Sequence, residues 1–356
     1  MYIETIEVYR LSQPLCEPYH LSYRSIHELD SVWVKVRLTN GSMGWGESTP
    51  LPGYSDSDIE AVWGVTNDLA TDWVGRDASQ VLAEPPRERD GFLFTAVWTA
   101  LEEATGRIAQ TSGKIPLVGL VQERSDESPV SALCRVRKHG YKVFKVKAGY
   151  LPVDKDKERL RVFQQNLRAG ERIRIDANQS LSEHQAKALL AVCNAGKVEL
   201  FEQPLPVGEW DACARLAQAA QVPIMLDESI TDLEALDRTS RSGAAQIVKL
   251  KWMKQGGITY LREMVERARE LGLLVVLGNG VAGWINNRHE AIFWLEKLQD
   301  MQLAGEMNGY LKLRDARVPL GFEDGCLSLA EIPIDQIAPA KYQPAAVRIY
   351  GMQRDQ

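Results

Sequence analysis

Five ionisable residues occur at near-regular intervals in the second half of the chain. They are Lys147, Asp176, Glu202, Asp227 and Lys251, and consecutive members are separated by 29, 26, 25 and 24 residues. Each lies at or just beyond the C-terminal end of a short run rich in β-branched residues. A strand, a loop, a helix and a return loop together use about this many residues. The spacing therefore predicts that all five lie on one rim of a closed (β/α)8 barrel, around one pocket.

The three carboxylates of this series predict a metal site. Asp176, Glu202 and Asp227 follow consecutive predicted strands, so their side chains should converge and repel one another in a concave site. A divalent cation removes that repulsion, and oxygen ligands without a nearby His or Cys favour Mg2+, with Mn2+ as a second possibility, over zinc. The alternative is that each acid caps a helix or is a surface charge. This alternative is reasonable for any one acid taken alone, but less so for three acids in register with two lysines.

Two lysine positions flank the acids and predict acid–base chemistry. Lys145 and Lys147 are two residues apart on one predicted strand, so both side chains point to the same face. Each charge makes protonation of the other more costly, and burial and a nearby Mg2+ should add to this and lower the lysine pKa towards the range of a general base. Lys251 should face Lys147 across the pocket. For a single pair of this kind, the alternative to acid–base chemistry is that both lysines are solvated at the end of the strand.

The elements that position these residues differ between the two parts of the chain. Residues 2–10 and 31–39 alternate like half-buried strands, Asn40-Gly41 predicts a hairpin turn, and helical patterns follow at about 58–74 and 90–112. After Gly113-Lys114, strands and helices alternate strictly. The predicted strands are 115–121, 142–147, 172–176, 198–202, 223–227, 246–251, 272–277 and 301–306. The predicted helices are 156–168, 181–195, 208–220, 231–242, 258–271 and 284–298.

This alternation predicts an α/β fold with a parallel, helix-covered sheet. We expect a modified TIM (β/α)8-type barrel at residues 114–321 and an N-terminal α+β capping domain at residues 1–113. The Pro-rich C-terminal segment 322–356 is expected to fold back and complete the capping domain.

Composition limits the function classes. The 356 residues are 45% hydrophobic, enough for a large core, and the net charge of −6 argues against nucleic acid as a partner. No stretch approaches the ~18 apolar residues of a membrane span, and the start of the chain does not resemble a secretory signal. The five cysteines are scattered and odd in number, which favours a reduced, cytoplasmic protein without a cysteine metal site. Acidic barrels of this size commonly associate, so we expect a homo-oligomer.

An ordered set of motifs spans nearly the whole chain. The set comprises GWGES at Gly44–Ser48, KxK at Lys145–Lys147, DAN at Asp176–Asn178, EQP at Glu202–Pro204, DES at Asp227–Ser229 and KxxxxGG at Lys251–Gly257. In this order the motifs resemble the enolase superfamily, and more narrowly the muconate lactonizing enzyme subgroup of the mandelate racemase/muconate lactonizing enzyme family.

The resemblance implies a reaction and a set of roles. Mg2+ would bind Asp176, Glu202 and Asp227, while Lys147 and Lys251, with Lys145 beside them, would be catalytic. The enzyme would remove the proton α to a substrate carboxylate and give a metal-stabilised enediolate. The overall outcome would be cycloisomerisation, or racemisation or epimerisation. The alternatives are a β-elimination (dehydratase) like that of o-succinylbenzoate synthase, or a non-catalytic metal-dependent binding protein, which would not need paired lysines.

The subgroup follows from residues at two strand ends. The mandelate racemase branch places a histidine base after the seventh strand, where this chain has Asn279. Dipeptide epimerases carry DxD after the eighth strand, where this chain has Glu306 and Asn308, a departure that disfavours a dipeptide and favours cycloisomerases. Lys249 is a second departure, because it points into the barrel below Lys251 and should pair with one of the acids.

The substrate is expected to be a small-molecule carboxylate. Candidate binding residues lie in the capping loops and around the rim: Arg24, Tyr54, Asn178, Asn279, Glu306 and Asn308. For Arg24, a solvated surface position is the alternative. The segment 278–283 also matches GxGxxG, but it falls in the seventh unit and lacks the acidic partner of a dinucleotide site. We expect this turn to bring backbone N–H groups near a substrate carboxylate or phosphate.

Overall fold

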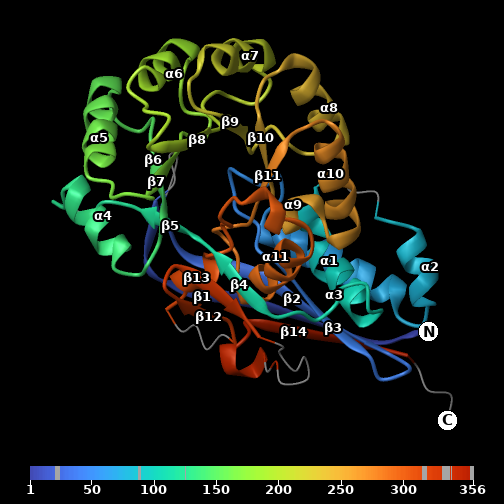
Figure 1. The fold of residues 1–356 in the computed structure, drawn as a ribbon. Coiled ribbons are helices and arrows are strands. Elements are labelled where there is room, and N and C mark those ends of the chain that lie inside the picture. Colours follow the sequence, from blue (N-terminus) through green and yellow to red (C-terminus); the bar gives the residue numbers. More distant parts are fainter. Residues whose placement is uncertain are drawn as a thin grey trace.

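The centre of the molecule is a curled, seven-stranded parallel sheet with helices around its outer face (Figure 1). The computed structural model describes residues 1–20, 25–86, 90–124, 126–314, 319–330, 337 and 339–352. The strands follow one another in space as in sequence: β5 (Val118–Val121), β6 (Val143–Lys147), β7 (Arg172–Asp176), β8 (Val198–Glu202), β9 (Ile224–Leu226), β10 (Ile247–Leu250) and β11 (Leu274–Leu277). This arrangement confirms the predicted barrel-type α/β fold.

The helices close each unit on the outside of the sheet. They are α4 (Pro129–Arg137), α5 (Val153–Gln165), α6 (Glu183–Leu190), α7 (Trp210–Ala219), α8 (Leu233–Ser242), the short α9 (Trp252–Gln255), α10 (Ile258–Glu270) and α11 (Trp284–Lys297). Local sequence sets several of their ends. Ser182 forms a capping box with Gln185 at the start of α6, and Gly243 ends α8 at φ +68°.

Strand alternation separates core residues from pocket residues. In β6, Phe144 and Val146 are buried in the hydrophobic core between sheet and helices. Lys145 and Lys147 alternate with them and line the pocket inside the barrel. The same alternation in β7 places Ile175 in the core and Asp176 in the pocket.

The predicted eighth strand at 301–306 is wrong. Residues Gln299–Met301 form a 3-10 turn, Gln302 is left-handed at φ +54°, and only an isolated bridge joins Gly305 to Leu117. Because a left-handed residue interrupts the extended conformation, no continuous ladder forms. Single hydrogen bonds from Val118 N to Gly305 O (3.0 Å) and from Glu306 N to Leu277 O (2.9 Å) nevertheless connect the segment to β5 and β11.

An antiparallel sheet in the order β14-β1-β2-β3 lies beside the barrel (Figure 1). Its strands are β1 (Ile3–His20), β2 (Ser25–Leu38), β3 (Met43–Ser48) and β14 (Ala346–Gly351). The predicted hairpin turn is confirmed, with Gly41 at φ +88°. Helix α3 (Thr95–Ala104) packs directly on β3 at Gly46, where a Cβ would be only 1.9 Å from Ala96 O.

The helices of this part are α1 (Ile59–Trp73), α2 (Ala78–Ala83), the 3-10 turn η1 (Gly91–Leu93) and α3 (Thr95–Ala104). The predicted single helix at 90–112 is wrong, because η1 precedes α3 and Gly106, at φ +79°, follows its end. No helix within the described residues is long and apolar enough to cross a membrane.

The C-terminal segment divides between two sheets. Strand β14 pairs antiparallel with β1, as the predicted fold-back requires. Strands β12 (Gly321–Glu323) and β13 (Cys326–Leu329) instead form a three-stranded sheet with β4 (Gly113–Pro116). The remaining 3-10 turns are η3 (Gly309–Lys312) and η5 (Pro339–Tyr342). The division of the chain at residue 113 stays a prediction.

Candidate active site

The five spaced residues lie at the C-terminal ends of five neighbouring strands. Lys147, Asp176 and Glu202 are the last residues of β6, β7 and β8. Asp227 and Lys251 directly follow β9 and β10. In the ladders, Lys147 is opposite Asp176 and Asp176 is opposite Glu202. All five line one pocket, so the structure places them on one rim.

The three acids are almost completely removed from solvent, with exposures of 1% for Asp176, 0% for Glu202 and 2% for Asp227. Burial alone would raise each pKa. For Asp176 and Asp227 the adjacent lysine charges outweigh burial, so their pKa values lie below the usual range. Glu202 differs, because burial and the charge of Asp176 raise its pKa despite two lysine partners. The acids therefore form a coupled group whose charge depends on the surrounding ammonium groups.

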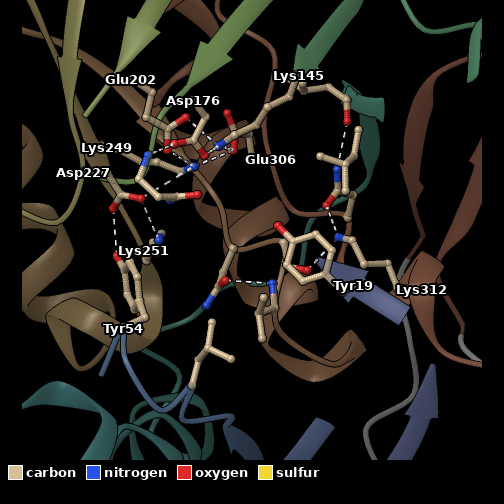
Figure 2. A pocket seen from close by; sticks show the side chains of 18 of the residues that line it. Tyr19, Tyr54, Lys145, Asp176, Glu202, Asp227, Lys249, Lys251, Glu306 and Lys312 are labelled. Carbon is tan, nitrogen blue, oxygen red and sulfur yellow. Dashed lines mark hydrogen bonds and ion pairs between the residues drawn. The ribbon is translucent and has the colours of Figure 1, made fainter. Parts of the chain in front are cut away.

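Lys145 and Lys249 place two ammonium groups among the acids (Figure 2). Lys145 Nζ lies 2.9 Å from Asp176, 2.5 Å from Glu202 and 2.9 Å from Glu306. Lys249 Nζ lies 2.9 Å from Glu202 and 2.5 Å from Glu306. Glu306 also pairs with Arg174 at 3.1 Å. The expected pairing of Lys249 with an acid is thus observed.

With the charges of the protein alone, the KxK pair does not show the predicted lowering of the pKa, to which Mg2+ was also expected to contribute. Burial on its own would lower the pKa of Lys145 and of Lys147, but the carboxylate charges, above all that of Asp176, raise both. The sequence argument counted the neighbouring lysine and omitted the acid on the adjacent strand. Lys251 differs from the KxK pair: burial lowers its pKa to about 8, although Asp227 lies only 2.9 Å away.

The acids suit a hard divalent cation in donor type. Three buried carboxylates from consecutive strands offer only oxygen donors, as Mg2+ prefers. The structure already holds a positive charge between two of them, since Lys145 Nζ contacts both Asp176 and Glu202. Among the described residues, no three or more Asp, Glu, His or Cys side chains are already arranged around one point as metal ligands. The residues therefore fit Mg2+ provided that the ammonium groups move away from Glu202.

The predicted substrate-binding residues gather in the same pocket, which is lined by Tyr54, Asn178, Asn279, Glu306 and Asn308. Arg24 lies outside the described residues.

Tyr54 and Asn178 each contact a proposed catalytic or metal-binding residue. The Tyr54 hydroxyl donates to Asp227 Oδ1 at 2.8 Å, and its ring centroid is 3.6 Å from Lys251 Nζ. Asn178 accepts a hydrogen bond from Lys147 and donates one to Glu228 at 3.1 Å.

The glycine-rich turn does not present the predicted row of N–H donors. Asn279 N donates to Glu290 at 3.1 Å, Val281 N donates to the Asn279 side chain at 2.8 Å, and Gly283 N donates to Glu47 at 2.5 Å. Three donors of the turn are therefore used within the protein, and that expectation is wrong for them. The Asn279 side chain remains part of the pocket wall.

Tyr19 and Lys312 are among the pocket residues that were not predicted from the sequence. Tyr19 comes from the end of β1, and Lys312 is the last residue of η3. Neither follows a barrel strand and neither belongs to a motif, so the spacing pattern contained no signal for them. Figure 2 shows both on the side of the pocket away from Lys251 and Tyr54.

Comparisons with known proteins show the family to which the chain belongs. A family model described as mandelate racemase/muconate lactonizing enzyme, N-terminal domain, matches residues 5–114, and one described as enolase C-terminal domain-like matches residues 130–333. Chloromuconate cycloisomerase of Cupriavidus pinatubonensis is 28% identical over 85% of this chain and 87% of its own length. L-Lys-D/L-Arg epimerase of Methylococcus capsulatus is 28% identical over 78% of this chain and 82% of its own.

Solved structures show the same fold. Muconate lactonizing enzyme from Pseudomonas fluorescens, complexed with muconolactone, superposes with a TM-score of 0.86 at 23% identity, covering 96% of this chain and 99% of that chain. A dipeptide epimerase from Cytophaga hutchinsonii, complexed with Mg and the dipeptide D-Ala-L-Val, superposes with a TM-score of 0.80 at 20% identity, covering 93% and 95%. At these identities the likeness concerns the fold alone.

Proposed function

Because the chain belongs to the mandelate racemase/muconate lactonizing enzyme family of the enolase superfamily, we propose that it removes the proton α to a carboxylate of a small-molecule substrate and returns a proton to the same carbon. Its relatives are cycloisomerases and epimerases, and on this ground the chain is an enzyme rather than a binding barrel.

The observation that carries the proposal is the order of charges along the rim. Lys147 on β6 and Lys251 after β10 flank three carboxylates that come from β7, β8 and β9. A substrate whose carboxylate binds to Mg2+ on these acids would therefore lie between two amines. One lysine can remove the α-proton from one face, and the other can deliver a proton to the opposite face, which inverts the carbon. Positioned general acid–base groups of this kind contribute about 10²–10⁴-fold in rate.

The remaining charged residues would stabilise the deprotonated substrate. Asp176, Glu202 and Asp227 would hold Mg2+, which when bound supplies positive charge to the oxygens of the substrate carboxylate. Lys145, already in contact with two of these acids, adds a further charge that is buried and fixed in place. Tyr54 holds Asp227 through its hydroxyl and covers Lys251 with its ring.

Cycloisomerisation is the second candidate, favoured by the match to chloromuconate cycloisomerase over 85% of the chain. A cycloisomerase moves a proton at one face of one carbon, so only one of the two flanking lysines would be essential for proton transfer. A racemase or epimerase needs both. The two candidates thus differ in how many lysines the reaction requires.

Hydrogen exchange tests the proposal directly. Single enantiomers of a panel of carboxylates are incubated with protein and Mg2+ in D2O, and loss of the α-proton is followed by NMR. We expect exchange that EDTA suppresses. In Lys147→Met one enantiomer should still exchange its α-proton, in Lys251→Met the other enantiomer should do so, and neither variant should invert the carbon. Exchange that neither substitution changes would contradict the lysine roles. Exchange that survives EDTA would contradict the Mg2+ requirement.

A further inference from the structure

Lys312 differs from the other lysines that line the pocket. Its Nζ donates to two neutral acceptors, Gly280 O at 2.6 Å and Asn308 Oδ1 at 2.9 Å. It makes no ion pair with any carboxylate in the part of the chain that the structure describes. Lys145, Lys147, Lys249 and Lys251, by contrast, each contact at least one acid.

The ammonium group of Lys312 is held in place rather than left to solvent. The ring of Tyr19 has its centroid 5.1 Å from Nζ, close enough for a cation–π contact. The carbonyl of Gly280 and the side chain of Asn308 fix the group from the seventh-strand turn and from the segment after the bridge at Gly305. The neutral contacts hold the charge in place without neutralising it.

The position of Lys312 suits the far end of a bound molecule. It lines the main pocket together with the acids, and it also lines a neighbouring hollow with Tyr19, Leu120 and Asn308. Figure 2 shows it across the pocket from Lys251 and Asp227. A substrate whose reacting carboxylate lies at the acids would therefore extend towards Lys312.

Building on the proposed function, we propose that Lys312 binds a second anionic group of the substrate, at the end remote from the carbon that loses its proton. A carboxylate there would gain a charge-assisted hydrogen bond from an ammonium group that lacks an acidic partner among the described residues. A substrate with an ammonium at that end would face a like charge. The substrate class is therefore a carboxylic acid with a second, distal anion.

The cost of keeping Lys312 charged supports the same assignment. Burial lowers the pKa of Lys312 to about 7, because nearby Glu306 compensates only in part and the other pocket lysines add to the repulsion. An incoming anion relieves this cost, so binding of a second carboxylate and protonation of Lys312 favour each other.

The test measures charge preference without turnover. Succinate, glutarate and adipate, each paired with its monoamide, are titrated into the Mg2+-loaded protein by calorimetry. The monoamide keeps one carboxylate and nearly the same shape, so the ratio of the two affinities reports the distal charge alone. We expect the wild type to bind at least one diacid about tenfold more tightly than its monoamide.

Three variants separate a charge role from a structural one. Lys312→Met should abolish the preference, Lys312→Arg should keep it, and Lys312→Glu should reverse it in favour of the corresponding ω-amino acid. Thermal denaturation verifies that each variant is folded. A wild type with no preference for any diacid, or a Lys312→Met variant that loses diacid and monoamide equally, would overturn the proposal.

The failure of the proposed function has a different signature. If wild-type protein prefers a diacid but exchanges no α-proton in D2O, the anion site stands and the catalytic proposal falls. If it exchanges α-protons of monoacids and diacids with equal KM, the catalytic proposal stands and the role of Lys312 is wrong.

Discussion

The two sides of the pocket handle buried charge in opposite ways. On the strand-end side, formed by the rim residues of β6–β10, every lysine contacts a carboxylate. On the return side, formed by Tyr19, Asn308 and Lys312, the ammonium group contacts only neutral groups among the described residues. On the strand-end side, carboxylates of the protein itself balance the charges of the lysines. On the return side, an anionic ligand would balance the charge of Lys312.

The difference follows from how each side is built. Parallel strands in register place Lys147 opposite Asp176, so a lysine and an acid at neighbouring strand ends meet in an ion pair. The return side is assembled from the end of a long β-strand and a 3-10 turn, and within the described residues no strand pairing sets Tyr19 and Lys312 opposite each other. Regular structure thus favours internal compensation, whereas irregular structure leaves a charge available to a substrate.

Removing either flanking lysine should have the largest effect on activity. Lys147→Met and Lys251→Met should each lower kcat for racemisation about 10²–10⁴-fold, because each removes a proton-transfer group. Both proteins should fold, since Asp176 keeps Lys145 as a partner and Asp227 keeps Lys254 at 3.2 Å.

Steady-state polarimetry measures the rates. Lys155→Met is the matched control, because Lys155 is a lysine of α5 whose side chain is 70% exposed. A loss of less than tenfold in both pocket variants would show that the flanking lysines are structural.

Lys249→Met tests the compensation on the strand-end side. The substitution leaves Glu202 and Glu306 with one ammonium fewer, and breaking a buried pair in this way costs about 3–5 kcal/mol. We expect the free energy of unfolding in EDTA to fall by about that amount. Because a divalent cation can replace the lost charge, added Mg2+ should stabilise the variant more than the wild type.

Urea denaturation with and without Mg2+ measures both effects. Equal Mg2+ stabilisation of the two proteins would mean that Lys249 does not offset the charge of the metal-binding acids.

Much of the strand-end side could be predicted from the sequence, because strand periodicity converts spacing into position. The interval between Lys147 and Asp176 placed both on one rim, and the barrel fold and family are confirmed. The pKa direction at Lys145 was missed, because the charge of Asp176 on the adjacent strand, followed by those of Glu202 and Glu306, outweighs burial and the neighbouring lysine. The catalytic and metal-binding roles stay predictions.

On the return side only Asn308 was expected in the pocket, and no periodic pattern indicates Tyr19 or Lys312. The bridge at Gly305 replaces a strand, and the contact of Lys312 with Gly280 joins two irregular segments. Tyr19 reaches the pocket from β1, a strand of the other sheet. Such contacts depend on how separate elements pack together, and the neighbouring residues in the sequence do not indicate them.

Diacid binding should depend on pH through the protonation of Lys312. With a pKa of about 7, Lys312 is charged below that pH and loses its proton above it. The charged groups that act on it are Glu306, which raises its pKa, and Lys145, Lys147 and Lys249, which lower it. The preference for a diacid over its monoamide should be complete at lower pH and fall up to about tenfold per pH unit above 7.

Calorimetry across this pH range provides the measurement, with Lys312→Arg as the matched control. A guanidinium stays charged throughout, so the control should show a flat preference. A preference that falls equally in both proteins would assign the titration to another group.

Tyr54→Phe should have the smallest effect, because it changes one hydrogen bond on the strand-end side. Phenylalanine keeps the aromatic ring over Lys251 but loses the hydroxyl that donates to Asp227. A hydrogen bond to a charged group is worth about 1.5–3 kcal/mol, so kcat for α-proton exchange should fall about tenfold or somewhat more. Tyr54→Leu, which removes ring and hydroxyl together, should lose more, since Lys251 then also loses its cation–π contact. Equal rates for the two variants would show that the ring contributes nothing and that the hydroxyl alone connects the capping loop to the acids.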